Sequence, residues 1–322
     1  MQYLIGMDEA GYGPNLGPLV ITATVWEVPG GVEAEELYDR LREAVTPVRG
    51  ETRDDSDRLA IADSKLLYST TKGLRHLELG VLATLAAVGL RPATWRAVWD
   101  QLAPDSGSVR QTIPWYARFD APIPVEASAD KVGRLADLLR RQLSAAGLRL
   151  VRTIARAVFV QEFNRLLEQY GSKGAALSHT ALTLAAAVLE DLPARPAAVV
   201  CDRHGGRKRY GQLLAEHFPP WLVEVDGEDP IRSVYRFGPA DRRVEFCFRV
   251  GAESCLPVAL ASMTSKYLRQ LAMMAFNAFW QGHVPGLRST AGYPQDAARF
   301  RRHIRRAQRR LGIDDRTLWR SR

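Results

Sequence analysis

The chain has 322 residues, of which 46% are hydrophobic and 25% charged, and its formal net charge is +8. This composition is ordinary for a soluble globular protein that buries a substantial core. No apolar run approaches the roughly 20 residues of a membrane-spanning helix. The opening MQYLIGMDEAG lacks a basic stretch, so we expect no secretory signal peptide. Three cysteines without zinc-site spacing favour a reducing cytoplasm over a disulfide framework.

The positive charge is concentrated at one end of the chain. Ten arginines, no lysine and two acids lie between Arg299 and Arg322, so this segment accounts for the whole net charge of +8. An apolar stripe at helical spacing predicts that the segment docks through one face and exposes arginines on the other. The stripe consists of Phe300, Ile304, Ala307 and Leu311. The exposed face either binds an anionic partner such as nucleic acid or is simply solvated.

Hydrophobic periodicity predicts an alternation of strands and helices. In the first half we expect strands at 3–7, 19–28 and 90–99, helices at 33–44 and 71–88, an exposed polar loop at 49–58, and an irregular proline-rich insertion at about 103–129. In the second half we expect helices at 131–146, 161–170, 174–191, 253–280 and 295–311, and strands at 148–160, 197–201, 222–225, 233–237 and 244–250. The fold class is therefore α/β, a mixed sheet with one early antiparallel pair and helices on both faces.

An acidic pair, Asp8 and Glu9, follows the first predicted strand in the motif MDEAGYGPNLGPL. Neighbouring strand residues point to opposite sides, so the two carboxylates share one ligand only if the chain bends there, and Gly11 and Gly13 allow a bend. A dinucleotide fingerprint is excluded because Leu16 occupies the third glycine position. Taken alone, the pair is either a ligand site or an exposed acidic turn.

Several further segments match one family in the expected order. The motif DEAGYGPNLGPLV resembles the opening strand and loop of the type 2 ribonucleases H, the ribonuclease HII and HIII families. The other resembling segments are ADSKLL at 62–67, AVFVQEFNRLL at 157–167, AVVCDRHG at 198–205, GAESCLPVALASMTSKYLRQLAM at 251–273 and STAGYPQDAARF at 289–300. Together they cover somewhat less than half of the chain.

The resemblance implies a ribonuclease H-like catalytic domain over 1–284, with the insertion at about 103–129, and a basic helical extension over 285–322. It implies an endoribonuclease that cuts the RNA strand of RNA·DNA hybrids with two Mg²⁺ or Mn²⁺ ions. The implied metal ligands and catalytic residues are Asp8, Glu9, Asp202 and Glu253. Oxygen ligands without histidine or thiolate suit these hard cations.

The resemblance also implies a nucleic-acid-binding set, namely Gly11, Tyr12, Gly13, Ser64, Lys65, Lys266 and Tyr293. Taken alone, each lysine is better explained by solvation, and core packing is the alternative for Tyr293. His204 follows Asp202 by two residues and is a weaker candidate for proton transfer, and His179 also lies near a matched segment.

Two residues indicate the ribonuclease HIII branch. Glu253 replaces the aspartate usual in the HII pattern, and Tyr12 gives GYG in place of GRG, whose arginine helps to recognise an RNA to DNA junction. The HIII families carry an N-terminal substrate-binding domain, for which we expect no counterpart before Asp8. Two alternatives stay open: a catalytically weak nucleic-acid-binding protein on the same fold, or a nuclease that acts on another nucleic acid.

Overall fold

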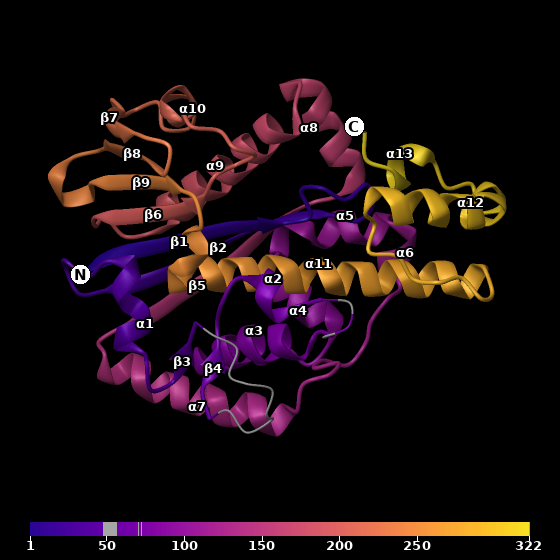
Figure 1. Ribbon diagram of the computed structural model, residues 1–322, viewed down its shortest axis with the longest axis horizontal. Helices are drawn as coiled ribbons and strands as arrows, with labels where there is room; N and C mark the ends of the chain where they lie inside the picture. The colour runs from indigo at the N-terminus through magenta and orange to yellow at the C-terminus, as the bar shows by residue number, and fades with distance from the viewer. Residues whose placement is uncertain (48–56, 70, 72, 322) are drawn as a thin grey trace.

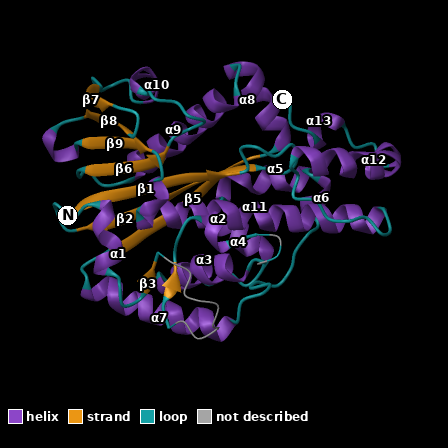
Figure 2. Ribbon diagram, in the orientation of Figure 1, coloured by secondary structure: helices purple, strands orange, loops and turns teal. Residues whose placement is uncertain are grey.

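The protein is described by a computed structural model that covers residues 1–47, 57–69, 71 and 73–321. A sheet of seven strands forms its centre, in the order β5-β2-β1-β6-β9-β8-β7 (Figure 2). The strands are β1 (Gln2–Ala10), β2 (Leu19–Val28), β5 (Arg149–Val158), β6 (Ala197–Asp202), β7 (Glu224–Glu228), β8 (Arg232–Phe237) and β9 (Val244–Arg249). The pairs β1–β6 and β6–β9 are parallel and the other four pairs are antiparallel. The predicted mixed α/β class and its early antiparallel pair are confirmed.

Helices cover both faces of the sheet (Figure 1). One face packs on α3 (Arg75–Ala87), α4 (Trp95–Leu102), α7 (Ala129–Ala145) and α11 (Leu256–His283), and the other on α8 (Val160–Tyr170), α9 (Lys173–Asp191) and α10 (Gly211–His217). Alternate residues of β1 enter the two apolar clusters: Leu4 lies in the first, and Tyr3, Ile5 and Met7 lie in the second. This alternation follows from the two-residue period of a strand.

The predicted strand at 90–99 is wrong, because α4 begins at Trp95. Thr94 caps this helix by accepting a hydrogen bond from the backbone N–H of Ala97. The buried residues of α4 recur at helical spacing, at Trp95, Val98, Trp99 and Leu102. Two tryptophans in this short apolar run suit a strand as well as a helix, so the capping threonine was the decisive signal.

Short helices and two short strands account for most of the remaining differences from the prediction. The insertion at 103–129 is not wholly irregular, since it contains η2 (Pro104–Ser106), α5 (Gly107–Thr112) and α6 (Pro114–Ala117). The helix expected at 33–44 is reduced to η1 (Ala34–Glu36) and α1 (Leu37–Arg40). The unforeseen elements are β3 (Val45–Thr46), β4 (Leu59–Ala60), α2 (Ser64–Leu67), α10, η3 (Ala240–Arg242) and α13 (Asp315–Leu318). Most of the polar loop expected at 49–58 lies outside the described residues.

The basic C-terminal segment packs onto the rest of the protein. Its main helix is α12 (Pro294–Arg310), and Phe300 on that helix packs against Phe276 of α11 with ring centroids 5.4 Å apart. Phe300 and Ile304 are fully buried in the same core cluster as α11. The predicted apolar stripe is thus confirmed, whereas the division into a domain at 1–284 and an extension at 285–322 stays a prediction. Among the described residues, no helix has the length and apolar character needed to cross a membrane.

Candidate metal centre

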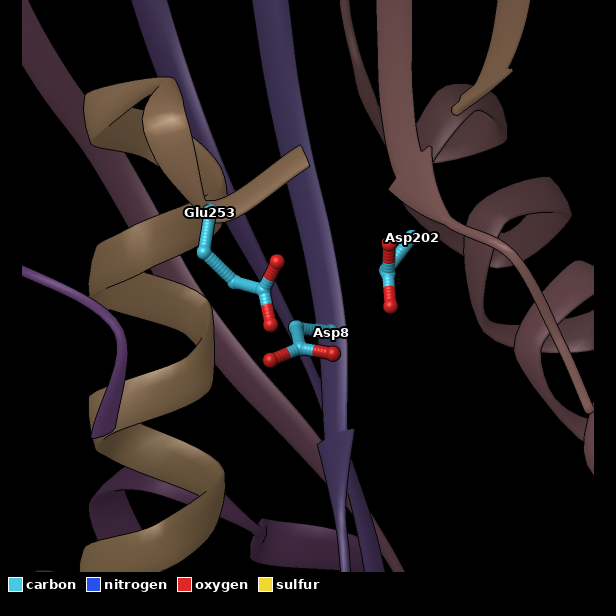
Figure 3. Close-up of side chains that lie close together, drawn as sticks. All are labelled: Asp8, Asp202 and Glu253. Carbon is cyan, nitrogen blue, oxygen red and sulfur yellow. The ribbon is translucent and has the colours of Figure 1, made fainter. Parts of the chain in front are cut away.

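Three carboxylates converge at one edge of the sheet. One oxygen each from Asp8, Asp202 and Glu253 lies within 4.8 Å of the others. Figure 3 shows the Asp8 side chain between those of Glu253 and Asp202, with all three directed toward a common space. These three of the four predicted acids therefore meet, although 194 residues separate Asp8 from Asp202.

The topology of the sheet explains why they meet. Asp8 lies near the end of β1 and Asp202 is the last residue of β6, and these strands are parallel neighbours. Parallel strands bring their carboxyl ends to the same edge. Glu253 lies in the short helix η4 (Ala252–Ser254), between the end of β9 and the start of α11. Since β9 is parallel to β6, it delivers Glu253 to this edge as well.

The carboxylates disfavour one another's charged forms. Burial raises the pKa of Asp8 well above its usual range, and Glu9 and Glu253 add to the effect. Burial also raises the pKa of Glu9, to about 7, with a further contribution from Asp202. The pKa of Asp202 is raised by burial and by Glu253. A partly buried cluster of like charges of this kind needs nearby positive charge to stay ionised together.

Glu9 does not belong to the group of three. The expectation that the chain bends at the acidic pair is wrong, since β1 continues through Ala10 and Asp8 and Glu9 remain paired with Thr22 and Ile21 of β2. The two side chains therefore start from opposite faces of one strand. Glu9 nevertheless lies close enough to Asp202 and Glu253 for each to raise its pKa. It can join the cluster only from the far side of β1.

Buried serines on α11 hold Asp8 in place. Ser262 forms a hydrogen bond with the Asp8 carboxyl that opposes the rise in its pKa, and Ser265 Oγ donates to the backbone oxygen of Asp8 over 3.0 Å. Ser64 is buried, and its Oγ lies 3.1 Å from Ser262 Oγ. The predicted contact of Ser64 with phosphate stays a prediction; in this structure the hydroxyl contacts Ser262 and not solvent. The signal for the helix serines was their polar character in an otherwise apolar helix.

Lys65 borders the acidic cluster, and Lys266 lies over the Tyr68 ring, close enough to Lys65 to be affected by its charge. Lys65 Nζ lies 3.4 Å from Glu253 Oε1. Burial lowers the pKa of this lysine, but the negative charges of Asp63 and Glu253 outweigh burial, so the pKa is raised overall. Lys266 Nζ lies 4.8 Å from the centre of the Tyr68 ring, and burial, Arg269 and Lys65 lower its pKa to about 8. Tyr293 is 51% exposed and precedes α12. Tyr68 was not foreseen, and its place directly after the segment ADSKLL was the available signal.

The glycine loop, residues 11–18, lies beside the same edge. Gly11 has a φ of +95°, and a Cβ atom there would lie 2.5 Å from the Pro18 oxygen, so this position requires glycine. Gly13 has no neighbour of this kind within 4 Å and its φ is not left-handed. Tyr12 is partly buried, and its hydroxyl lies 2.9 Å from the site of a Cβ on Gly205. Tyr12 thus packs from the glycine loop against the turn after β6.

Neither candidate histidine faces the acidic cluster. His204 is buried edge-on against Phe248, with ring centroids 5.7 Å apart, in the core on the opposite face. Burial and Arg207 lower its pKa to about 4, so it is neutral at physiological pH. His179 stacks on Tyr170 and contacts His217 at 3.1 Å. A proton-transfer role for His204 finds no support in this geometry.

The donor set fits hard divalent cations. The group found among the described residues consists of Asp8, Asp202 and Glu253, so all of its donors are carboxylate oxygens. Mg²⁺ and Mn²⁺ prefer such ligands. The raised pKa values of Asp8 and Asp202 indicate that the ammonium of Lys65, which contacts Glu253, leaves the negative charge of the cluster undercompensated. Asp8, Asp202 and Glu253 are the residues that would hold such ions.

Comparisons with known proteins give the following results. No family model and no curated protein matches the sequence. Among solved structures, the chain is similar to ribonuclease H2 from Pyrococcus horikoshii, with 15% identity, coverage of 98% of this chain and 92% of that chain, and a TM-score of 0.45.

The chain is also similar to ribonuclease HII from Archaeoglobus fulgidus, solved in complex with PCNA, with 15% identity, coverage of 99% and 94%, and a TM-score of 0.44. For Bst-RNase HIII in complex with Mn²⁺ the identity is 17%, the coverage 99% and 66%, and the TM-score 0.42.

Proposed function

We propose that this protein is a metal-dependent endoribonuclease that hydrolyses the RNA strand of RNA·DNA hybrids. The convergence of Asp8, Asp202 and Glu253 within 4.8 Å is the observation that supports it most strongly. The ordered motifs of the sequence agree, since each of these acids lies in a segment that resembles the type 2 ribonucleases H. We include Glu9 as a fourth acidic residue that acts from the far side of β1.

Two Mg²⁺ or Mn²⁺ ions, when bound, would supply the positive charge that activates water and stabilises the leaving 3′ oxygen. The chain's own residues place the substrate. In this proposal Lys65 and Lys266 contact the phosphate backbone, and such contacts fix the register of a nucleic acid without reading its sequence. The exposed ring of Tyr293 is available to stack on a sugar or base, and the backbone of Gly11 to Gly13 is available to meet the 2′-hydroxyl.

The test is a cleavage assay with labelled RNA·DNA hybrid, duplex DNA and duplex RNA, each with Mg²⁺, with Mn²⁺ and with chelator. We expect cleavage of the hybrid alone, only with metal. Asp202→Asn should lower the rate by at least about 100-fold. Loss of a residue that only hydrogen-bonds to a metal ligand lowers activity by about 10–100-fold, and loss of a ligand itself lowers it further. Asp241→Asn, an exposed acid on η3, is the matched control and should keep full activity.

The outcomes separate the alternatives. Tight binding of the hybrid with no metal-dependent cleavage would reject the proposed enzymatic activity and favour a nucleic-acid-binding protein. Such an outcome would agree with Tyr12, which replaces the arginine of the GRG pattern. Metal-dependent cleavage of duplex DNA or duplex RNA in place of the hybrid would keep the nuclease chemistry and reject the substrate. The proposal also includes a cytoplasmic location and the use of two metal ions.

A further inference from the structure

Two arginines from distant parts of the chain hold the backbone of the glycine loop. Four carbonyl oxygens of the loop accept hydrogen bonds from them, those of Gly11, Pro14, Asn15 and Leu16. Arg320, which follows α13, provides three of these bonds, and Arg269 of α11 donates to Leu16 O over 3.2 Å. A Cβ atom on Gly11 would lie 2.8 Å from Arg269 Nε, so Arg269 borders this residue as well.

The position of Arg320 is itself fixed by α8. Arg320 is 4% exposed, and its guanidinium carbon lies 4.4 Å from the centre of the Phe163 ring. Asn164 donates to Trp319 O over 2.9 Å and accepts from Ser321 N over 2.7 Å. In Figure 1 the C-terminus accordingly lies beside α8 and α13. The backbone on both sides of Arg320 is thus held, and this determines where the guanidinium reaches.

The hydrogen bond from Arg320 sets the direction of one peptide unit. A trans peptide is planar, so its C=O and its N–H point to opposite sides. Gly11, with a φ of +95°, turns its C=O toward the buried guanidinium, and Tyr12 N–H therefore points to the other side of the loop. Within the described chain this N–H has no hydrogen-bond partner, and the next residue, Gly13, is exposed. Tyr12 N–H is therefore a donor that a ligand can use.

The contacts of the Arg320 side chain indicate that it serves the loop. Its guanidinium contacts two loop oxygens and one aromatic ring, and among the residues described it pairs with no carboxylate. A buried charge without an opposite charge destabilises a fold, whereas an apolar side chain of similar volume is often tolerated or even stabilising. Packing against Phe163 alone therefore does not require an arginine. The loop oxygens do require a donor.

We propose that Arg320 is a positioning residue that prepares the glycine loop for the RNA strand of the substrate. In this inference, which rests on the proposed function, Tyr12 N–H donates to a 2′-hydroxyl oxygen and Arg320 fixes the direction of that N–H without touching the substrate. The loop begins directly after β1, which carries Asp8, so a sugar bound there lies beside the metal centre. DNA lacks the 2′-hydroxyl, so the oriented N–H favours the hybrid over duplex DNA.

The first test observes the two atoms concerned by NMR. Labelling with [1-¹³C]glycine and [¹⁵N]tyrosine selects the peptide units Gly11–Tyr12 and Gly292–Tyr293, and Tyr12→Phe assigns them. Arg320→Met should shift the Gly11–Tyr12 signal, because it removes the donor to Gly11 O. Arg316→Met, which removes an exposed arginine of α13, is the matched control and should leave the signal in place. An unchanged signal in Arg320→Met would overturn the proposal.

The second test compares the affinity for a hybrid with that for duplex DNA of the same sequence, in an Asp202→Asn background. Arg320→Met should weaken hybrid binding by about 10-fold, the effect of one hydrogen bond, and leave duplex DNA binding unchanged. Its Mn²⁺ affinity in the otherwise wild-type chain should also stay unchanged. A merely structural role would lower all three affinities together, and that result, or a hybrid preference equal to that of Arg316→Met, would count against the proposal.

A third measurement keeps Arg320 and covers the case in which Arg320→Met does not fold. In Asp202→Asn alone, the hybrid should shift the Gly11–Tyr12 signal and slow the exchange of the Tyr12 amide hydrogen, and duplex DNA should do neither. A bound hybrid that leaves this signal in place would reject the inference. Failure of the proposed function looks different: wild-type protein would not cleave the hybrid, whereas a shift of the signal in Arg320→Met would still support the positioning of the loop.

Discussion

Gly6 of β1 lies directly against the backbone of Pro257 in α11. A Cβ atom at Gly6 would be 2.2 Å from the carbonyl carbon of Pro257, and Thr24 Oγ1 donates to the Pro257 oxygen over 2.8 Å. Asp8 follows Gly6 by two residues, and Glu253 precedes Pro257 by four. This contact therefore sets the distance between two of the three clustered carboxylates.

Gly6→Ala should separate the strand from the helix. Side chains cannot relieve an overlap between backbone atoms, so we expect a loss of at least about 3 kcal/mol in the free energy of unfolding. Hybrid cleavage should fall more than stability alone explains when it is measured well below the unfolding midpoint. Gly133→Ala on α7, where nothing lies within 4 Å of an added Cβ, should be neutral or slightly stabilising. Wild-type stability and activity in Gly6→Ala would show that this contact does not set the carboxylate geometry.

Elements with a strong period were predictable from the sequence to within a residue or two. The second strand was predicted at its observed bounds, Leu19–Val28, because its ten residues are rich in β-branched side chains. The helix α4, which begins at Trp95, was missed because its eight residues are too few for the pattern of apolar residues to distinguish a helix from a strand. The short helices of the insertion are fixed by distant contacts. For example, Trp115 of α6 packs against Phe276 of α11, with ring centroids 5.2 Å apart.

Repulsion within the metal centre predicts that an acid can be removed with a gain in metal-free stability. Asp202→Asn should raise the free energy of unfolding in chelator by about 1 kcal/mol, since it removes a negative charge close to Glu253. Mn²⁺ should stabilise the wild type and have much less effect on the variant. Urea denaturation with and without Mn²⁺ measures both effects. The exposed Asp241→Asn should change neither, and a metal-free variant less stable than the wild type would contradict the prediction.

Ser262 should matter for metal affinity more than for substrate affinity. Ser262→Ala removes a hydrogen bond to the Asp8 carboxyl. Loss of a residue that hydrogen-bonds to a metal ligand lowers metal affinity by about 10–100-fold. Thr264→Val is the matched control, because Thr264 is buried in the same helix and donates to Leu260 O. Both variants should lose about 1 kcal/mol of stability. Calorimetric titration with Mn²⁺ separates them, and equal affinities would show that Ser262 does not orient Asp8.

The candidate site was predictable as a set of residue types and less so as a geometry. Asp8, Asp202 and Glu253 were foreseen through motif resemblance, and parallel strands bring them together. The bend at Glu9 was predicted wrongly because β1 continues for three residues beyond Met7, where its apolar run was expected to end, and pairing with β2 holds these residues in the strand. Arg269 and Arg320 could not be paired from the sequence, since 51 residues separate them and only the fold brings both to Gly11.

The lowered pKa of Lys266 predicts that hybrid affinity depends on pH. Burial, with Arg269 and Lys65, brings this pKa to about 8, so the ammonium is charged below pH 8 and loses its proton as pH rises through that value. If Lys266 contacts phosphate, hybrid affinity should fall several-fold between about pH 7 and pH 9. Arginine stays charged over this range, so Lys266→Arg should flatten the profile.

Fluorescence anisotropy in an Asp202→Asn background measures this binding without cleavage. Lys208→Arg, at an exposed position after β6, is the matched control and should keep the wild-type profile. Raising the salt concentration should shrink the pH effect, because the contact is electrostatic and phosphate binding releases counterions. An unchanged profile in Lys266→Arg would remove Lys266 from the substrate path and leave Lys65 as the lysine beside the metal centre that meets the backbone.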